Sequence, residues 1–382
     1  MVEESIVHPK EESKVTPWEV KGDIDYTKLI KEFGLQPMNY KDLPKVFHDE
    51  ILFRREFVFA HRSFGSIVSA IENKKPFVMM TGCMPTGKFH IGHMIVARQI
   101  IFYQSLGAKV YICVADIEAY NARGQSLEES RRIAIEEYLL NYIALGLKPE
   151  NCEIYFQSDR SKEGKKADAY YRLQNLIARH ITFNEFKAVY GEITPGKMVS
   201  ALLQASDMLH AQLAEFEHPI SVIVPVGIDQ DPHIRLTRDV IGRINNYNDF
   251  KFKELCSTCH TFIPGLNGGK MSSSDATSFI ALTDSPEDAA KKIKKYAFSG
   301  GKDTIDEHRR LGGNPDIDVS YQWLRIFEED DALLKKVYDD YKSGSLLSGE
   351  LKTLLINKLT SFLTEHQKNR EKARKVLNHY VV

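Results

Sequence analysis

The fold is decided by one stretch of the chain, Phe77-Val-Met-Met-Thr-Gly-Cys-Met-Pro-Thr-Gly-Lys-Phe-His-Ile-Gly-His93. Its first four residues are apolar and run into Thr-Gly, which predicts a buried strand that ends in a tight loop. A helical pattern follows from about Ile91 to Leu106, and the apolar run from Val110 to Ala115 predicts a second buried strand. A strand, a loop, a helix and a strand in this order are typical of a parallel sheet.

The rest of the chain extends this pattern. Residues 153–156 and 221–226 predict further strands, and residues 165–215 are helical in pattern. Ser126-Leu-Glu-Glu129 predicts the capped start of a helix that ends near Gly146. Residues 24–75 alternate short helical patterns with charged turns, and after residue 275 the pattern is helical with few strand signals. We therefore expect an α/β fold: a Rossmann-like, doubly wound parallel sheet with a helical insertion, followed by an all-helical C-terminal region.

The composition excludes several classes of protein. The 382 residues include 51 Lys and Arg against 52 Asp and Glu, a formal net charge of −1, and 43% of them are hydrophobic. This excludes a chain that is disordered throughout and a polycation that coats nucleic acid, and the length predicts two or three domains. Five cysteines do not make a disulfide scaffold. Neither a secretory signal nor a membrane-spanning apolar run is visible, so we expect a cytoplasmic protein without a membrane partner.

A local excess of positive charge lies between residues 351 and 382. Only Glu365 and Glu371 oppose its seven basic residues, which are Lys352, Lys358, Lys368, Arg370, Lys372, Arg374 and Lys375. A solvated helix face is one interpretation of this patch, and a surface for phosphate groups is the other.

Two motifs compete in the loop after the first strand. Gly82-x4-Gly87-Lys88 nearly matches a phosphate loop, but Phe89 replaces the hydroxyl that would hold magnesium and Pro85 removes a backbone N–H, so we reject it. The motif that we retain, the first of three, is His90-Ile-Gly-His93, at the expected start of a helix directly after a strand. Backbone N–H groups and the helix dipole favour phosphate there, and Gly92 would let a flat base approach the backbone.

Two later motifs complete a pattern. The second motif, Lys270-Met-Ser-Ser-Ser274, follows a glycine-rich lead, and the third, Gly227-Ile-Asp-Gln230, follows the strand expected at 221–226. Together with the first motif they resemble the class I aminoacyl-tRNA synthetases, in the branch that holds the tyrosine and tryptophan enzymes. Nearly the whole chain resembles the archaeal and eukaryotic tryptophanyl-tRNA synthetases. The stretches that carry this resemblance include His180-Ile-Thr-Phe-Asn184, Ile228-Asp-Gln-Asp-Pro232, Ala297-Phe-Ser-Gly-Gly-Lys-Asp-Thr-Ile-Asp-Glu-His308 and Gly312-Gly-Asn-Pro-Asp-Ile-Asp-Val-Ser320.

The resemblance implies an activity and a set of partners. A member of this family activates L-tryptophan with ATP, which carries Mg²⁺, to tryptophanyl-adenylate and pyrophosphate, and then transfers tryptophan to the 2′-OH of the terminal adenosine of tRNA(Trp). It works as a homodimer. The alternatives are a tyrosyl-tRNA synthetase of the same class, a small nucleotidyltransferase and a catalytically silent tRNA-binding relative. Exchange assays with each amino acid distinguish a tyrosyl-tRNA synthetase from a tryptophan enzyme.

The resemblance also implies three regions. Residues 1–75 would be an N-terminal extension that packs on the catalytic domain, and residues 76–275 the Rossmann-like catalytic domain, with a helical connective insertion at about 125–215. Residues 276–382 would be a helical anticodon-binding domain whose last helix returns to the catalytic domain.

Site residues are carried over position by position. The resemblance implies catalytic roles for His90, His93 and Lys270. It implies ATP-binding roles for Gly82, Thr86, His90, Gly92, His93, Gly227, Asp229, Lys270, Met271, Ser272 and Ser273. It implies tryptophan-binding roles for Met80, Cys113, Glu118, Gln204, Asp207 and Gln230. Ile91 belongs to the motif 90–93 and Ser274 to the motif 270–274.

The expected amino-acid pocket departs from the animal pattern. Animal enzymes place a Tyr and a Gln at the positions of Met80 and Cys113, both aimed at the indole nitrogen. Something else must accept the indole N–H here, because a buried unpaired donor costs about 1–3 kcal/mol. Asp207 matches an aspartate of the bacterial tryptophan enzymes, although tyrosine enzymes carry one there too; the apolar Met80 favours indole. Glu118 matches the glutamate that binds the substrate ammonium, and a plain loop acid is the alternative.

One further pattern, Cys256-Ser-Thr-Cys259-His260, has several interpretations. Its spacing matches covalent haem attachment, which belongs to an extracytoplasmic setting. Two cysteines and a histidine could bind zinc with a fourth ligand from elsewhere. Cys83, Cys113 and Cys152 form no second pair, so we favour a plain structural or redox pair and expect no metal held by the protein.

Overall fold

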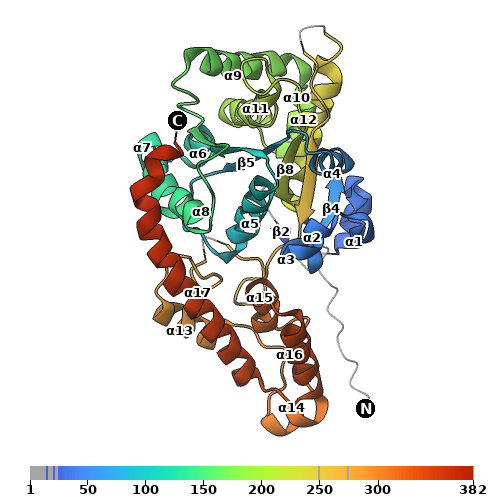
Figure 1. The fold of residues 1–382 in the computed structure, drawn as a ribbon, viewed down its shortest axis with the longest axis vertical. Coiled ribbons are helices and arrows are strands. Elements are labelled where there is room, and N and C mark those ends of the chain that lie inside the picture. Colours follow the sequence, from blue (N-terminus) through green and yellow to red (C-terminus); the bar gives the residue numbers. More distant parts are fainter. Residues whose placement is uncertain (1–13, 16–19, 22–24, 248–249, 273–274, 382) are drawn as a thin grey trace.

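A seven-stranded sheet forms the centre of the computed structural model, which describes residues 14–15, 20–21, 25–247, 250–272 and 275–381 (Figure 1). The strands lie in the order β3-β4-β9-β8-β5-β6-β7. Their bounds are β3 Gln36–Pro37, β4 Val58–Arg62, β5 Val78–Cys83, β6 Lys109–Val114, β7 Cys152–Phe156, β8 Val222–Gly227 and β9 Cys256–His260. The five strands from β9 to β7 are parallel, and β4 and β3 extend the sheet antiparallel. A separate pair, β1 Lys14–Val15 and β2 Val20–Lys21, lies outside this sheet.

The expected parallel, doubly wound sheet is therefore confirmed, but three of its strands were not anticipated. β3 and β4 lie in the region expected to hold only short helices and turns, so part of residues 1–75 belongs to the sheet itself. β9 coincides with the cysteine pattern at 256–260. A search for apolar runs does not find β9, because its Ser and Thr side chains are polar. These side chains are nevertheless buried, and Thr258 Oγ1 donates to Gln99 Oε1 at 3.2 Å.

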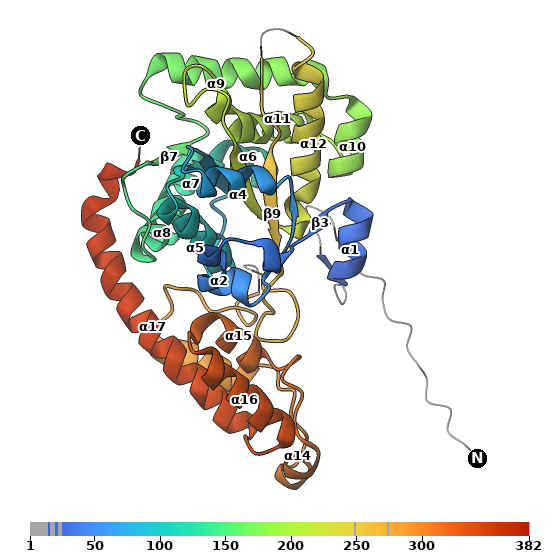
Figure 2. The ribbon, with the colours of Figure 1, turned by 45° about the vertical axis from the view of Figure 1, so that its right-hand side comes forward.

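Side chains that alternate along the strands divide the core into two layers. Met79, Ile112 and Ile154 face one layer, which is closed by α5 Ile91–Ser105 and α8 Leu140–Ala144. Met80, Cys113 and Tyr155 face the other, which is closed by α9 Gly164–Ile177, α11 Pro195–Leu209 and α12 Asp231–Ile244 (Figure 2). The second layer supplies the walls of the cavity described below.

The remaining helices connect these elements. The N-terminal region holds α1 Tyr26–Phe33, α2 Lys45–Asp49, α3 Ile51–Arg54 and α4 Gly65–Glu72. After β6 come α6 Asp116–Arg123, α7 Leu127–Ile133 and a π-helical turn, Ala134–Leu139, which leads directly into α8. Ser126 caps α7 as expected, since its side chain accepts from Glu129 N–H. The range of about 125–215 also contains β7 of the main sheet, so the helices between β7 and β8 are α9, α10 Phe183–Tyr190 and α11.

The C-terminal region is helical, as expected. It consists of α13 Pro286–Tyr296, α14 Ile305–Leu311, α15 Val319–Phe327, α16 Asp331–Ser343 and the long α17 Ser348–Val376. α17 runs from this helical part back along α8 to the far edge of the sheet (Figures 1 and 2). There, Ile154 N–H of β7 donates to Tyr380 O at 3.0 Å. None of the helices in the described ranges is long and apolar enough to cross a membrane.

Three of the seven basic residues near the C-terminus bond to residues outside α17. Lys358 pairs with Glu328 at 2.9 Å, Arg374 pairs with Glu136 at 2.6 Å, and the buried Arg370 donates to Asn141 Oδ1 at 2.7 Å. They hold α17 in place, which corrects the interpretation of the whole patch as a free surface for phosphate.

Candidate active site

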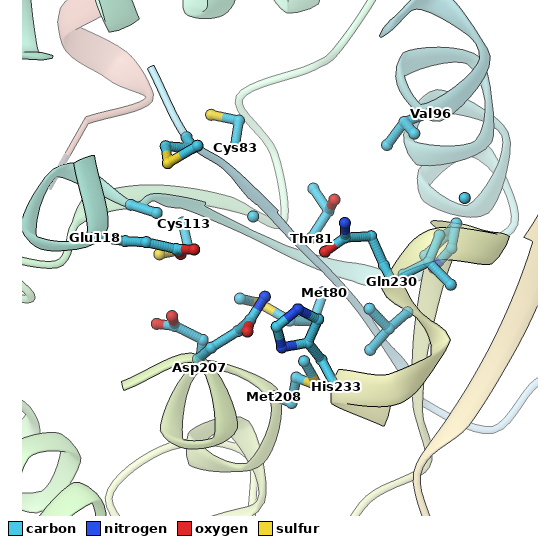
Figure 3. A pocket seen from close by; sticks show the side chains of 18 of the residues that line it. Met80, Thr81, Cys83, Val96, Cys113, Glu118, Asp207, Met208, Gln230 and His233 are labelled. Carbon is cyan, nitrogen blue, oxygen red and sulfur yellow. The ribbon is translucent and has the colours of Figure 1, made fainter. Parts of the chain in front are cut away.

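The candidate site lies where the order of the strands reverses. β6 and β7 lie on one side of β5, and β8 and β9 on the other, so the loops after β5 and β8 diverge at the carboxyl ends of neighbouring strands. Ligands of open α/β sheets bind in the crevice that such a divergence leaves. A cavity of about 390 Å³ is found here, and Figure 3 shows side chains from β5, β6, α6, α11 and α12 around it.

His90 and His93 form the start of α5. His90 caps the helix, because its Nδ1 accepts Gly92 N–H at 3.1 Å, and His93 Nδ1 accepts His90 N–H at 3.1 Å. The two rings stack with centroids 3.8 Å apart. Since both Nδ1 atoms accept, each ring carries its proton on Nε2. Burial lowers the pKa of His90 to about 2 and the pKa of His93 to about 4, so both are uncharged N–H donors at neutral pH.

Gly92 lies where the second motif meets this helix. A Cβ at Gly92 would lie 2.9 Å from Cε1 of His90 and 3.4 Å from Sδ of Met271, so a side chain would push the capping ring away. The same Met271 sulfur lies 3.3 Å from Gly92 N–H, and Ser272 N–H donates to Ser278 Oγ at 3.1 Å. The first two motifs are thus in direct contact. The predicted Ser273 and Ser274 lie outside the described residues.

The second and third motifs meet through an ion pair. Lys270 Nζ lies 3.6 Å from Asp229 Oδ2 and 4.9 Å from the centroid of the Phe262 ring. A Cβ at Gly227 would lie 2.7 Å from Asp229 Oδ1, so glycine is needed for this carboxylate to fold back over the end of β8. Burial raises the pKa of Asp229, and the Lys270 ammonium opposes that rise.

Asp207 is a buried acceptor at one end of the cavity, with 4% of its surface exposed. Its Oδ1 accepts the hydroxyls of Tyr155 at 2.8 Å and Tyr170 at 2.7 Å, and its Oδ2 accepts Gln157 Nε2 at 2.9 Å. The Cys113 thiol, a weak donor, also bonds to this carboxylate. Burial raises the pKa of Asp207, while these donors lower it. A carboxylate offers about four acceptor positions, so a ligand N–H can take the place of the weak thiol donor.

Glu118 lies beside Asp207, and Figure 3 shows both carboxylates at the same end of the cavity. Glu118 is in the first turn of α6, and its backbone N–H donates to Gln157 Oε1 at 3.2 Å. Burial, and then the Asp207 carboxylate, raise the pKa of Glu118 to about 7, against the opposing effect of Arg123. A ligand cation placed between the two carboxylates would relieve their repulsion.

The structure gathers most of the predicted site residues around this one cavity. Those that line it are Met80, Gly82, Thr86, His93, Cys113, Glu118, Gln204, Asp207, Gly227 and Gln230. The predicted residues that adjoin it through the contacts given above, without lining it, are His90, Gly92, Asp229, Lys270, Met271 and Ser272. Ile91, which follows His90 in the first motif, is fully buried in the core.

Sequence reasoning missed the residues that hold Asp207. Tyr155 lies on β7, Gln157 directly follows β7, and Tyr170 lies on α9. A polar residue at the carboxyl end of a parallel strand was the signal that could have identified Gln157. Behind Tyr155 lies Arg160, 1% exposed, whose guanidinium lies 3.8 Å from the centroid of that ring and donates to Glu153 Oε1 at 2.5 Å.

The two cysteines of the pattern at 256–260 do not form a pair. Residues three apart in a strand point to opposite faces, and Cys256 is buried in one core layer while Cys259 packs with the N-terminal helix α1. His260 bonds to Gln99 Nε2 at 3.2 Å. Within the described residues, no group of three or more His, Cys, Asp or Glu side chains could hold a metal ion. These cysteines are separate core residues of β9.

Comparison with known proteins agrees with this geometry. The family model described as tRNA synthetases class I (W and Y) matches residues 72–364. The tryptophan–tRNA ligase of Aeropyrum pernix is 41% identical over 95% of this chain and 96% of its own length. That of Methanocaldococcus jannaschii is 40% identical, again over 95% of this chain and 96% of its own length.

Solved structures give the same result. The crystal structure of tryptophanyl-tRNA synthetase from Aeropyrum pernix superposes with a TM-score of 0.87, over 94% of this chain and 96% of that one, at 41% identity. The enzyme of Encephalitozoon cuniculi bound to tryptophan superposes with a TM-score of 0.81 over 94% of this chain and 98% of its own, at 27% identity. By sequence, by architecture and by its three motifs, this chain belongs to the class I tRNA synthetase family of tryptophan and tyrosine enzymes.

Proposed function

We propose that this chain is a tryptophan–tRNA ligase, which forms tryptophanyl-adenylate from L-tryptophan and ATP and then esterifies tRNA(Trp). The observation that carries the proposal is a single cavity with two chemically different ends. One end holds two buried carboxylates, Glu118 and Asp207, and the other leads to the uncharged histidine pair at the start of α5. The curated relatives named above are tryptophan–tRNA ligases.

The carboxylate end suits the amino acid. Asp207 Oδ2 accepts the indole N–H, and Glu118 binds the ammonium. Met80 and Cys113 supply apolar walls for the flat ring, with the amides of Gln204 and Gln230 at its margins. A charge-assisted hydrogen bond of this kind contributes about 1.5–3 kcal/mol. Because Tyr155 and Tyr170 already hold Asp207, the acceptor is in place before the substrate arrives.

The histidine end suits the triphosphate. The substrate carboxylate attacks the α-phosphorus, the bond to the bridging oxygen breaks, and pyrophosphate leaves with that oxygen. The nucleophile is already an anion, so no general base is needed and catalysis consists of positioning and charge stabilisation. His90 and His93 donate from Nε2 where the helix dipole also favours negative charge. Lys270 leaves Asp229 and moves to the departing pyrophosphate.

The nucleoside part of ATP binds at the ends of β5 and β8. Gly227 and Asp229 bind the ribose, and Gly82, Thr86 and Gly92 let the nucleotide approach the backbone. We assign the remaining ATP contacts to Met271 and Ser272, which follow Lys270, and to the predicted Ser273, which lies outside the described residues. Mg²⁺ is carried with ATP as the counter-ion of its triphosphate.

The second step needs a tRNA that spans the molecule. The 2′-OH of the terminal adenosine attacks the adenylate carbonyl and releases AMP. We assign anticodon recognition to the helical domain 276–382, and the N-terminal extension 1–75 to support of the catalytic domain. We further propose that the enzyme acts in the cytoplasm as a homodimer, which sedimentation at micromolar protein concentration tests.

A tyrosyl-tRNA synthetase is the alternative within the family. A phenol hydroxyl needs an acceptor and a donor, whereas an indole N–H needs only an acceptor. The thioether of Met80 donates no hydrogen bond, and this favours indole.

Pyrophosphate exchange with each of the twenty amino acids tests the proposal. We expect exchange with tryptophan, and exchange with tyrosine alone would refute it. Asp207→Ala should lower kcat/KM for tryptophan by roughly 10- to 100-fold, the equivalent of one charge-assisted hydrogen bond, and leave ATP binding within about twofold. An equal loss for both substrates would contradict the indole assignment.

A further inference from the structure

The loop between β5 and α5, residues 84–90, delivers His90 to the site. Gln125 Nε2 donates to Pro85 O at 2.9 Å and Leu282 N–H donates to Phe89 O at 2.9 Å, and further anchors come from the π-helical turn Ala134–Leu139. Tyr138 OH donates to Thr86 O at 3.2 Å, Lys88 Nζ lies 2.6 Å from Glu137 Oε1, and Phe89 N–H donates to Glu137 Oε2 at 3.4 Å. The rejected phosphate-loop lysine is therefore an anchor of the loop.

Aromatic packing adds to these bonds. The fully buried Phe89 ring meets Tyr138 and Tyr142 edge-on, with centroids 5.6 and 5.5 Å away. Tyr138 also lies 5.6 Å from the His93 ring and lines the cavity. The turn thus contacts the nucleotide side of the site both through the loop and directly.

The other side of the same turn is held by α17. Arg374 makes two hydrogen bonds to the Glu136 carboxylate, at 2.6 and 2.8 Å, and Arg370 Nη2 donates to Glu136 O at 2.9 Å. Asn141, which donates to Glu137 O, accepts from Arg370 at 2.7 Å and bonds to His366 at 2.8 Å. Glu136 therefore faces α17, and the next residue, Glu137, faces the loop 84–90.

A π-helical turn inserts an extra residue into a helix, and such turns are frequent at functional sites. Here the wider turn lets Glu136, Glu137 and Tyr138 point to partners on different elements. We propose that the turn 134–139 is a positioning device for the nucleotide step: it sets the loop 84–90 through Glu137 and Tyr138, and its own position depends on α17 through Glu136. Because α17 begins in the helical domain 276–382, a change in the position of that domain would change the affinity for ATP. The inference rests on the proposed function for its assay.

The first test distinguishes an effect on KM for ATP from an effect on KM for tryptophan. Glu137→Gln keeps an acceptor for Phe89 N–H but removes the charge that pairs with Lys88, and the exposed Lys88→Met removes the other partner. In pyrophosphate exchange we expect either change to raise KM for ATP about three- to tenfold, with KM for tryptophan within about twofold. The double variant should be no worse than the more severe single variant, because both remove one interaction. Equal changes in both KM values, fully additive effects or an unchanged KM for ATP would overturn the proposal.

The second test addresses α17. Arg374→Met should also raise KM for ATP, and Arg374→Lys should raise it less. Lys375→Met is the matched control, an exposed neighbour in the same helical turn, and should change nothing. Equal effects of Arg374→Met and Lys375→Met would refute the link to α17.

Failure of the proposed function is distinguishable from failure of this inference. Absence of tryptophan-dependent exchange in the unmodified chain would refute the function alone. Calorimetric titration with ATP would then still decide whether Glu137→Gln weakens nucleotide binding, as the positioning role requires.

Discussion

The two carboxylates at one end of the cavity predict an acid limb in the capture of tryptophan. Glu118 binds the substrate ammonium only when it is ionised, and burial beside Asp207 raises its pKa to about 7. About 90% of Glu118 is therefore charged at pH 8 and about 10% at pH 6. The ammonium of free tryptophan stays charged over this range. We expect kcat/KM for tryptophan to fall about tenfold between pH 8 and pH 6, whereas an ordinary glutamate would give a nearly flat profile.

The assay is pyrophosphate exchange with tryptophan varied and ATP saturating, measured from about pH 5.5 to pH 8.5. The same series with ATP varied is the control, since His90 and His93 are uncharged throughout this range. Glu118→Gln should lower kcat/KM for tryptophan and remove the limb. A flat profile in the unmodified chain would refute the reasoning. A limb that persists in Glu118→Gln would assign the titration to Asp207 instead.

Three further predictions follow from the same geometry. Lys270→Ala should slow adenylate formation about 100-fold in single-turnover measurements with near-normal tryptophan affinity, and an unchanged rate would refute its role. Gly92→Ala should raise KM for ATP about fivefold, because a Cβ 2.9 Å from the His90 ring breaks its helix cap; an unchanged KM would show that the cap is not needed. Arg160→Met should lower the free energy of unfolding in urea by about 3 kcal/mol, since Glu153 is left buried and unpaired, and adding Glu153→Leu should recover most of it.

The sequence predicts those parts of the site that depend on local spacing. His90 and Gly92 are encoded at the junction of a strand and a helix, which predicts their place at the start of α5, whereas the capping role of His90 is seen only in the structure. The partners of Asp207 are different, because Tyr155, Gln157 and Tyr170 precede it by 52, 50 and 37 positions and meet it only after β7 and α11 have packed. No local pattern contains such contacts.

The missed strands have a related cause. β9 is paired on both edges and covered on both faces, so its small polar side chains are buried by their neighbours and not by their own hydrophobicity. β4 follows the short helix α3 within a few residues and has only Val58 and Ala60 fully buried. Tertiary context decides the conformation of both segments.

The return of the chain to β7 has a consequence for the solubility of the fold. A strand at the edge of a sheet presents unpaired backbone groups to which another molecule can add a strand. Here, Tyr380 and Val381 occupy that position on β7, where Ile154 and Val381 form a parallel bridge. At the opposite edge, β3 is only two residues long and carries Pro37, which has no N–H to offer. The C-terminal segment covers the β7 edge at Ile154, so loosening this segment would expose more of that edge to strand addition by another molecule.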